Sequence, residues 1–291
     1  MASRVEDFFS FARERYQIKL KREAGEPGPW TTDPILQAYR FCNIFREDDK
    51  TTRWFRSNIT EPLGHDWPRQ YMAAVIFRWF NKIETGELLK DLLLGSWDTE
   101  EARRRLYRRV SLEKVPILGA AYMIKSPPGM NKVDGLLQCI DAVRERHMDL
   151  VASIFNYQTL QRAHEELVEF PYLGSFMAYE IVTDLRHTPV LRNAKDVDTW
   201  AAAGPGAARG LCRVMDVPLG TYRYQSAKDQ EPLLKGMQRL LAFSRGGLWP
   251  AEWPRWEMRE VEHTLCEFDK YERARLGEGT PKQRFSLSRG K

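Results

Sequence analysis

Apolar residues recur with the spacing of an α-helix along nearly the whole chain, and this pattern constrains the fold more than any other feature. In the first such segment, Val5, Phe8, Phe9, Ala12 and Tyr16 fall on one helical face. Alternation typical of strands is nearly absent, and the best candidate is GAAYMIKS at residues 119–126. The sequence therefore predicts a mainly α protein, with helices over residues 5–22, 34–47, 68–81, 100–110, 131–147, 157–170, 174–185, 205–215, 231–243 and 256–274.

The composition is that of a folded intracellular protein. Of the 291 residues, 43% are hydrophobic, which is enough for a large core, and the net charge of +5 is compatible with a phosphate-rich partner. The four cysteines lie far apart and form no CxxC pair, so we expect neither a disulfide framework nor a zinc site. The N-terminal segment is charged throughout, and no later segment is apolar for long enough to cross a bilayer. We therefore expect a soluble, cytoplasmic protein.

A short turn, PYLG, separates two predicted helices. Backbone amides at such a turn and at the following helix start can bind a DNA phosphate without reading sequence, which makes Tyr172, Gly174 and Ser175 DNA-binding candidates. Asp198, in VDTW some two dozen residues later, stands near a second helix start and is a candidate catalytic acid. The alternative is a buried helix pair with a turn glycine, and the hairpin alone does not decide between the two.

A second glycine-containing turn, AAGPGAARGL, opens another predicted helix. Gly204 and Gly206 flank Pro205, and Arg209 follows one turn into the helix. Backbone amides together with a guanidinium suit a phosphate or a pyrophosphate. No GK[ST] follows, so the turn is not an ATP-binding P-loop, and a tight helix–helix turn is the alternative.

Basic and amide side chains recur at helical spacing in two predicted helices. Arg40, Asn43 and Arg46 share one helical face, and Arg78 with Asn81 repeats this chemistry on a later helix. Such side chains can bond to base edges or phosphates. The run ARRRLYRRV would add a salt-dependent attraction to a phosphate backbone. In each case a solvated helix face is the alternative.

A further group of reactive side chains lies in VEHTLCEFDKYER. Glu267 and Lys270 can serve proton transfer or hold an amino-acid ligand. His263 lies four residues before Glu267, but no second His is close enough in sequence to indicate a metal site, so we predict no metal-binding residue. Cys266 fits a small buried hydrophobe better than a nucleophile.

Five ordered segments together resemble a known family, the phage thymine-hypermodification proteins. These proteins are described as α-glutamyl/putrescinyl-thymine pyrophosphorylases and as amino acid:DNA transferases, and a related helical domain accompanies the 5-hydroxymethyluracil DNA kinases. The hairpin with VDTW also resembles, in part, the helix-hairpin-helix DNA glycosylases. The position of their Schiff-base lysine is Phe176 here, so we do not expect a lyase. The five segments are DPILQAYRFCNIFREDD, AYMIKSPPGM, LGSFMAYEIVTDL, AGPGAARGL and CEFDKYER.

The resemblance implies a fold and a domain organisation. The expected fold is helical and glycosylase-like, with a helix-hairpin-helix and, in one form of it, two lobes around a central cleft. We predict a single helical domain over residues 1–276, with the hairpin region at residues 170–215. A flexible basic tail should follow at residues 277–291.

The resemblance also implies a reaction on double-stranded phage DNA. Hydroxymethyluracil is pyrophosphorylated on its hydroxymethyl group, and a family enzyme then replaces pyrophosphate with an amine, often that of an amino acid. Because the sequence contains no P-loop, the transferase step is implied rather than the kinase step. The target nucleotide would be flipped into a pocket. In the implied roles, Arg209 with the GPGA turn compensates pyrophosphate, Asp198 or Asp184 removes the proton of the amine, and Arg40, Arg46 or Lys270 holds an α-carboxylate.

Two other functions fit the same residues. A glycosylase that excises a modified pyrimidine would use Asp198 to stabilise an oxocarbenium-like sugar or to activate water. A non-catalytic DNA-binding subunit of a modification complex would need no acid at all. The sequence leaves open which amine is used, whether Mg²⁺ assists pyrophosphate, whether the phage 5-hydroxymethyluracil DNA kinase is a bound partner, and which oligomeric state the protein adopts.

Overall fold

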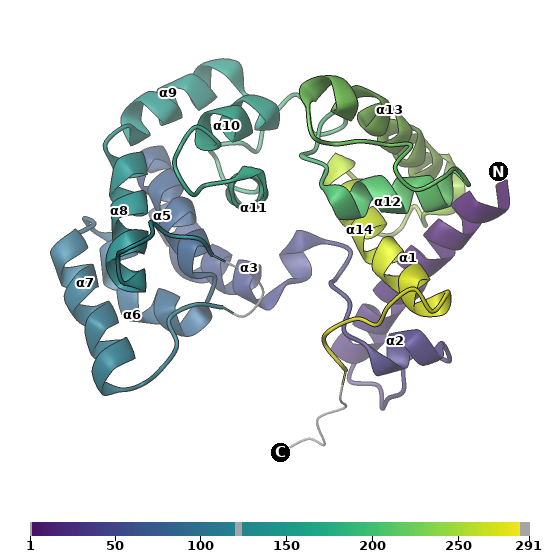
Figure 1. The fold of residues 1–291 in the computed structure, drawn as a ribbon, viewed down its shortest axis with the longest axis horizontal. Coiled ribbons are helices and arrows are strands. Elements are labelled where there is room, and N and C mark those ends of the chain that lie inside the picture. Colours follow the sequence, from purple (N-terminus) through teal and green to yellow (C-terminus); the bar gives the residue numbers. More distant parts are fainter. Residues whose placement is uncertain (1, 120–123, 286–291) are drawn as a thin grey trace. The chain divides into compact units, whose positions relative to one another are not determined.

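The computed structural model describes residues 2–119 and 124–285, and in this part of the chain every regular element is a helix (Figure 1). The prediction of a mainly α protein is thereby confirmed. Residues 120–123, in the middle of the strand candidate, lie outside the described residues. None of the helices that the structure describes is long and apolar enough to span a membrane.

The helices group into two compact units. Unit 1 combines residues 1–48 with residues 197–291, and unit 2 is residues 49–196. That these units act as the one domain expected over residues 1–276 stays a prediction. The α-helices are α1 (Ala2–Glu23), α2 (Pro34–Ala38), α3 (Lys50–Phe55), α4 (Glu61–Leu63), α5 (Trp67–Phe80), α6 (Ile83–Leu94), α7 (Thr99–Tyr107), α8 (Lys132–Arg144), α9 (His147–Tyr157), α10 (Leu160–Leu167), α11 (Ser175–Leu185), α12 (Pro205–Val214), α13 (Ala227–Phe243) and α14 (Met258–Arg275). Short 3₁₀ or π turns are η1 (Arg46–Asp48), η2 (Arg56–Thr60), η3 (Arg108–Leu112) and η4 (Ser244–Leu248).

Aromatic rings fill the core of unit 1. The ring of Phe8 meets those of Trp256 and Phe268 edge to face, with centroids 6.0 Å and 5.6 Å apart, and Phe9 lies 5.4 Å from Trp256. All four side chains are buried. Edge-to-face pairs add a directional attraction to the gain from burying apolar area. The apolar face predicted for the first helix therefore packs inward, against the residues around α14.

Two glycines let α12 approach α14 closely. A Cβ at Gly206 would come within 2.4 Å of Cys266 Sγ, and a Cβ at Gly210 within 2.1 Å of the carbonyl oxygen of Leu265. Residues four apart lie on the same helical face, so the two glycines form the surface that receives α14. Gly206 therefore serves helix packing, and its place in a substrate-binding turn stays a prediction.

α5 forms the buried centre of unit 2. Every residue from Gln70 to Phe80 is buried, and α6, α8, α9 and α11 pack against this helix. Asp66 caps the start of the helix, since its carboxylate accepts a hydrogen bond from the amide of Arg69, and Asn81, in the left-handed conformation, caps the end. A helix that is apolar on all sides is expected in such a central position.

One ion pair is enclosed in the core of unit 2. Arg78 of α5 donates from Nη2 to Oδ1 of Asp184 in α11 at 2.7 Å and from Nε to the other carboxylate oxygen, and its Nη1 donates to Asn81 at 2.7 Å. All three side chains are buried. These positions do not fit the DNA-contacting role predicted for Arg78 and Asn81 or the catalytic role predicted for Asp184, because the charges neutralise each other away from the surface.

The helix predicted over residues 34–47 ends early. α2 stops at Ala38, the amide of Arg40 donates to a carbonyl close to the C-terminal end, and the amide of Cys42 donates to the carboxylate of Glu267 at 2.8 Å, 225 residues further along the chain. Because these amides are used in tertiary hydrogen bonds, they cannot also close helical turns. The prediction that Arg40, Asn43 and Arg46 share one helical face is therefore wrong.

Part of the predicted flexible tail is hydrogen-bonded to the segment after α2 within unit 1. The amide of Phe285 donates to the carbonyl of Ala38 at 2.9 Å, and the carbonyl of Gln283 accepts from the amide of Arg40 at 3.0 Å. Residues 286–291 lie outside the described residues.

Removing one member of the buried pair should destabilise unit 2 strongly. We expect Asp184→Asn to lower the free energy of unfolding by about 3–5 kcal/mol, because it leaves the guanidinium of Arg78 buried without its counter-charge. The matched control is Asp91→Asn, which breaks an exposed pair with Arg105 and should cost less than about 1 kcal/mol. Chemical denaturation followed by circular dichroism measures both. Equal denaturation midpoints for the two variants would contradict a structural role for the buried pair.

The packing of α12 on α14 predicts a second stability difference. Gly210→Ala should destabilise the protein by about 1–3 kcal/mol or more, because the added methyl group meets the backbone of α14, which cannot move aside as a side chain can. Gly246→Ala is the control, since a Cβ there meets nothing within 4 Å. Thermal unfolding of both variants tests this, and a Gly210→Ala protein as stable as Gly246→Ala would show that the helices are not in close contact.

Candidate functional site

The turn predicted to bind DNA joins α10 to α11 in unit 2. Leu173 is buried, whereas Tyr172, with a φ of 65°, is exposed. Gly174 precedes α11 and gives no side-chain cap, so the first amides of this helix lack one. Ser175 Oγ lies 3.0 Å from Nε2 of His164, within hydrogen-bonding distance. The two helices and the turn expected here are present, and the glycosylase-like fold and DNA binding by the turn stay predictions.

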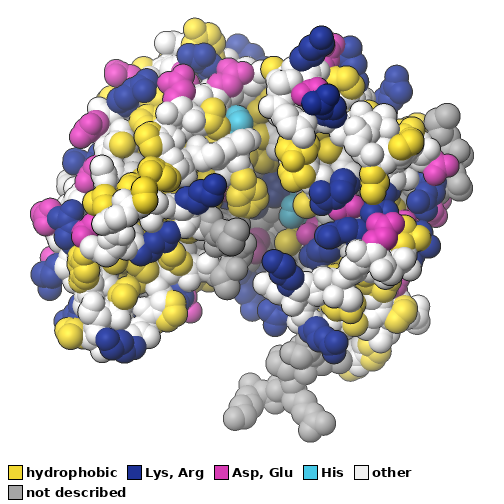
Figure 2. Space-filling view, in the orientation of Figure 1, with side chains coloured by type: hydrophobic (Ala, Val, Ile, Leu, Met, Phe, Trp, Pro, Cys, Tyr) yellow, Lys and Arg dark blue, Asp and Glu magenta, His cyan; other side chains and the backbone are white. Residues whose placement is uncertain are grey.

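The arginine run on α7 and η3 is largely neutralised by neighbouring carboxylates. Arg105 pairs with Asp91 and Glu101, and Arg103 pairs with Glu100 and Asp134. The other three arginines of the run also have acidic partners in the glutamates nearby. On the face that Figure 2 shows, basic side chains are interspersed with acidic ones. The run therefore supports a phosphate-binding surface less than the sequence indicated.

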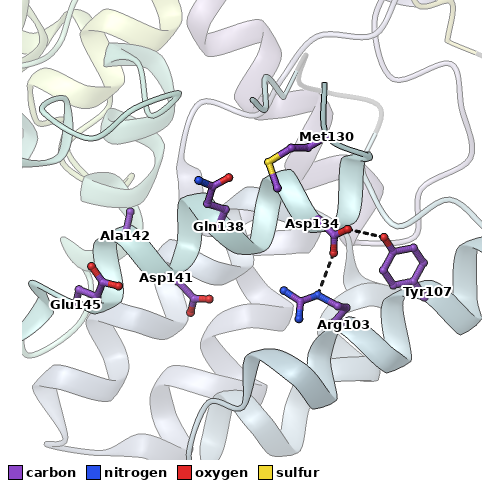
Figure 3. A pocket seen from close by; sticks show the side chains of 8 residues that line it. All are labelled: Arg103, Tyr107, Met130, Asp134, Gln138, Asp141, Ala142 and Glu145. Carbon is purple, nitrogen blue, oxygen red and sulfur yellow. Dashed lines mark hydrogen bonds and ion pairs between the residues drawn. The ribbon is translucent and has the colours of Figure 1, made fainter. Parts of the chain in front are cut away.

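A hollow of about 790 Å³ lies between α7 and α8 (Figure 3). Asp134 on its wall accepts hydrogen bonds from Arg103 at 2.9 Å and from Tyr107 at 2.7 Å. Apart from Arg103 of the arginine run, none of the residues predicted from the sequence to act in catalysis or binding lines this hollow. Its wall is formed by Arg103, Tyr107, Met130, Asp134, Gln138, Asp141, Ala142 and Glu145.

The start of α12 in unit 1 keeps the properties expected of an anion site. Gly204 precedes the helix in an extended conformation, and no side chain caps the first turn. Space around Gly204 is open, since a Cβ there would meet nothing within 4 Å. The first amides of a helix have no partner within it and carry a partial positive charge. Arg209 adds a guanidinium one turn further on, with its side chain 40% exposed.

Glu267 and Lys270 form an ion pair on α14 that is a second candidate binding group in unit 1. The carboxylate of Glu267 accepts from Lys270 Nζ and from the amide of Cys42, each at 2.8 Å. Lys270 Nζ also lies 4.6 Å from the ring centroid of Phe41, a cation–π contact. Arg15 of α1 donates to the carbonyls of Phe41 and Cys42, which fixes this segment from the other side. We call Phe41, Cys42, Glu267 and Lys270 the α14 cluster.

The ionisation states in the α14 cluster suit ligand binding better than nucleophilic attack. Burial alone would raise the pKa of Glu267, but the charges of Lys270 and His263 and the hydrogen bonds from Lys270 and Cys42 hold that pKa below its ordinary value. Glu267 is therefore a carboxylate at neutral pH. Burial raises the pKa of the neighbouring Cys266 thiol to about 12, so this side chain is not a thiolate and packs as a small hydrophobe.

Asp198 lies in unit 1 and binds two guanidinium groups. Its Oδ1 accepts from Arg245 at 2.5 Å and its Oδ2 from Arg255 at 2.8 Å, and its own side chain is partly exposed. The hairpin predicted to act with Asp198 belongs to unit 2. Their joint action, and the catalytic role of Asp198, stay predictions.

Arg40, Asn43 and Arg46, which were predicted to share one helical face, lie in different surroundings in the structure. Asn43 Nδ2 donates to the carbonyl of Asp48 at 2.9 Å, which stabilises the turn into η1. Arg46 is half-buried at the start of η1. Arg40 is exposed and directly precedes the α14 cluster in the chain. Of the three, Arg40 has the position best suited to binding a ligand next to Lys270.

Sequence reasoning missed the residues that fix these groups. Arg15 was hidden in the amphipathic pattern of α1, and nothing in the sequence links it to a segment 26 residues away. Asp269 lies within CEFDKYER, but only the position of α12 reveals that it binds Arg209 and Arg213. In residues 2–119 and 124–285, no three His, Cys, Asp or Glu side chains come together as a metal site would require.

Comparisons with known proteins place the chain in one family. The family described as "5-hmdU DNA kinase, helical domain" matches residues 2–280. A curated relative, the 5-hmdU DNA kinase of Bacillus phage SP10, is 25% identical over 219 residues, which is 68% of this chain. The match covers 34% of that relative, so the chain spans about a third of its length. No solved structure matches significantly.

The family match runs from α1 through α14 and includes the start of α12 and the α14 cluster. It agrees with the resemblance to the helical domain of 5-hydroxymethyluracil DNA kinases. The chain belongs to the family of 5-hmdU DNA kinase helical domains.

Proposed function

We propose that this protein modifies 5-hydroxymethyluracil bases in phage DNA by replacing a pyrophosphate on the base with an amine. The observation that carries the proposal is the family match, which connects the chain to an enzyme named for 5-hydroxymethyluracil in DNA. The sequence holds no P-loop, so phosphorylation of the base is assigned to a separate kinase activity. In this proposal the protein works in the cytoplasm of an infected bacterium.

The reaction is a substitution at the exocyclic methylene of the base. The bond between this carbon and the pyrophosphate oxygen breaks, pyrophosphate leaves with the electron pair, and the nitrogen of the amine forms the new bond. An amine that arrives as an ammonium group first loses one proton, which gives its nitrogen a free electron pair, and the nitrogen loses a second proton once the new bond has formed. Both protons pass to the pyrophosphate or to solvent, and Asp198 is a candidate relay for the first. The departing charge needs preorganised donors, for which the uncapped amides of α12 and the guanidinium of Arg209 are suited.

The α14 cluster suits the amine when it is carried by an amino acid. An amino acid is a zwitterion, and Glu267 with Lys270 offers the complementary pair of charges. The ammonium group would take the place of Lys270 on the ionised carboxylate of Glu267, and the α-carboxylate would bind Lys270 and the exposed Arg40. Lys270 is accessible for this exchange, because its side chain is 24% exposed.

DNA binding is assigned to the hairpin of unit 2 in this proposal. Amides at the start of α11 would hold a backbone phosphate, and the exposed ring of Tyr172 is available for stacking. The target base must leave the duplex, because its methylene group is otherwise out of reach of an enzyme.

Mass analysis of the DNA product tests the proposal directly. Purified protein is incubated with duplex DNA that carries pyrophosphorylated hydroxymethyluracil and with a mixture of amino acids, and the DNA is digested to nucleosides. We expect a nucleoside in which one amino acid has replaced the pyrophosphate. Free base with abasic DNA would instead identify a glycosylase. DNA that is bound but unchanged would identify a non-catalytic subunit.

Substitution of Glu267 should weaken use of the amine selectively. We expect Glu267→Gln to raise the KM for the amino acid about tenfold or more, because a charge-assisted bond to the ammonium group is lost. The glutamine oxygen can still accept from the amide of Cys42, so the segment stays in place. Glu231→Gln, in an exposed pair with Lys235, is the control and should change nothing. An unchanged KM for the amine in Glu267→Gln would remove Glu267 from the site.

A further inference from the structure

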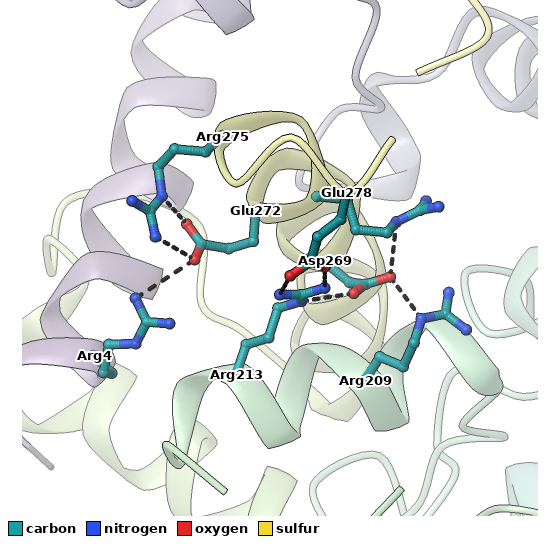
Figure 4. A network of polar contacts seen from close by, with 8 residues as sticks. Arg4, Arg209, Arg213, Asp269, Glu272, Arg275 and Glu278 are labelled. Carbon is teal, nitrogen blue, oxygen red and sulfur yellow. Dashed lines mark hydrogen bonds and ion pairs between the residues drawn. The ribbon is translucent and has the colours of Figure 1, made fainter. Parts of the chain in front are cut away.

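Three arginines surround one buried carboxylate at the contact of α12 with α14 (Figure 4). Asp269 of α14 has a side chain only 1% exposed. Its Oδ2 accepts from Nε of Arg209 at 2.9 Å and lies 3.4 Å from Nε of Arg273, while its Oδ1 accepts from Nε of Arg213 at 2.9 Å. In all three cases the guanidinium nitrogen closest to the carboxylate is Nε.

The terminal nitrogens of these arginines have different surroundings. Those of Arg213, which is buried, donate to Glu278. The side chains of Arg209 and Arg273 are 40% and 42% exposed. Arg209 donates to Asp269 from Nε, whereas Nε of Arg273 makes no hydrogen bond and is the nitrogen through which this arginine comes closest to the carboxylate. Two planar guanidinium groups are therefore held next to one shared oxygen, Arg209 by a hydrogen bond and Arg273 by its charge, and no hydrogen bond within the described residues occupies their Nη groups.

Arginines bind the nearby buried carboxylate of Glu272 in a different way from that of Asp269. Arg275 binds that carboxylate through both Nε, at 2.7 Å, and Nη2, at 2.8 Å, so its bidentate edge is already used. Arg4 approaches the same carboxylate at 3.5 Å. Around Asp269, by contrast, three cations meet two carboxylates, those of Asp269 and Glu278, so positive charge remains for an anion.

We propose that Arg209 and Arg273 form a clamp for phosphate oxygens, with Asp269 as its positioning residue. Guanidinium groups bind phosphate through paired N–H donors, and fixing the Nε edge beforehand reduces the entropy lost on binding. The uncapped start of α12 lies on the same helix as Arg209 and adds to the positive potential. The ligand is either pyrophosphate or a backbone phosphate of DNA. Its identification as the departing pyrophosphate rests on the proposed function, whereas the clamp itself does not.

Binding measurements on matched arginine variants test the clamp. Titration calorimetry with inorganic pyrophosphate and fluorescence anisotropy with unmodified duplex DNA at fixed salt are applied to wild type, Arg209→Ala, Arg273→Ala and Arg275→Ala. Arg275→Ala is the control, because Arg275 shares α14, an exposure of 42% and a buried carboxylate partner with Arg273. We expect the first two variants to weaken binding about tenfold or more, and the control to leave it unchanged.

The outcomes separate the two sources of phosphate. Loss of pyrophosphate affinity alone identifies the leaving group, and loss of affinity for unmodified DNA identifies the backbone. If Arg209→Ala and Arg273→Ala bind both probes as the wild type does, or no more weakly than Arg275→Ala, the clamp is disproved. The result is independent of product formation, so a failed transferase assay would leave a demonstrated clamp standing.

The positioning role of Asp269 has its own readout. Asp269→Asn should weaken binding of the same probe without removing either arginine, because the guanidinium groups of Arg209 and Arg273 lose the carboxylate charge that positions both of them. Where this variant fails to fold, as judged by its thermal unfolding, Arg209→Lys and Arg273→Lys replace it. These keep the positive charge and lose the planar fork, so affinities equal to those of the wild type would show that charge alone suffices and would overturn the clamp.

Discussion

Burial of carboxylates on α14 is the constraint on which unit 1 depends. Removing such a charge from water costs several kcal/mol unless cations and hydrogen-bond donors surround it. α14 buries Glu267, Asp269 and Glu272, so the elements around it must supply those donors. α1 supplies Arg4, α12 supplies Arg209 and Arg213, and the segment after α2 supplies the amide of Cys42. The other cations, Lys270, Arg273 and Arg275, belong to α14 itself. The same requirement brings together the groups from which the proposed chemistry is built.

The sequence predicted helices where apolar periodicity is strong and packing follows it. α1, α5, α12 and α14 lie close to their predicted positions because their apolar faces are the ones that the cores bury. α3, α6 and α9 were not predicted. For α6 the signal was available, since Leu89, Leu92 and Leu93 have helical spacing and are buried. The early end of α2 could not be predicted, because the amide of Cys42 bonds to a carboxylate 225 residues away.

The candidate site was predictable in its residue types and not in its arrangement. The segment CEFDKYER showed that carboxylates and a lysine recur on one helix, and the turn at Gly204 showed an anion-binding helix start. The sequence did not distinguish Asp184, which Arg78 neutralises in a core, from Asp269, which anchors exposed arginines, because each is defined by partners far along the chain. Local patterns therefore suggest a site, and tertiary ion pairs decide which of its charges remain available.

The central claim is that pyrophosphate leaves while the base stays on the DNA. It is tested most directly by labelling the pyrophosphoryl group of the modified base and counting released pyrophosphate against abasic sites in one reaction, with and without an amino acid. The account predicts one inorganic pyrophosphate for each amine incorporated and no abasic sites. Free base that still carries its pyrophosphate, or abasic DNA in proportion to turnover, would contradict it.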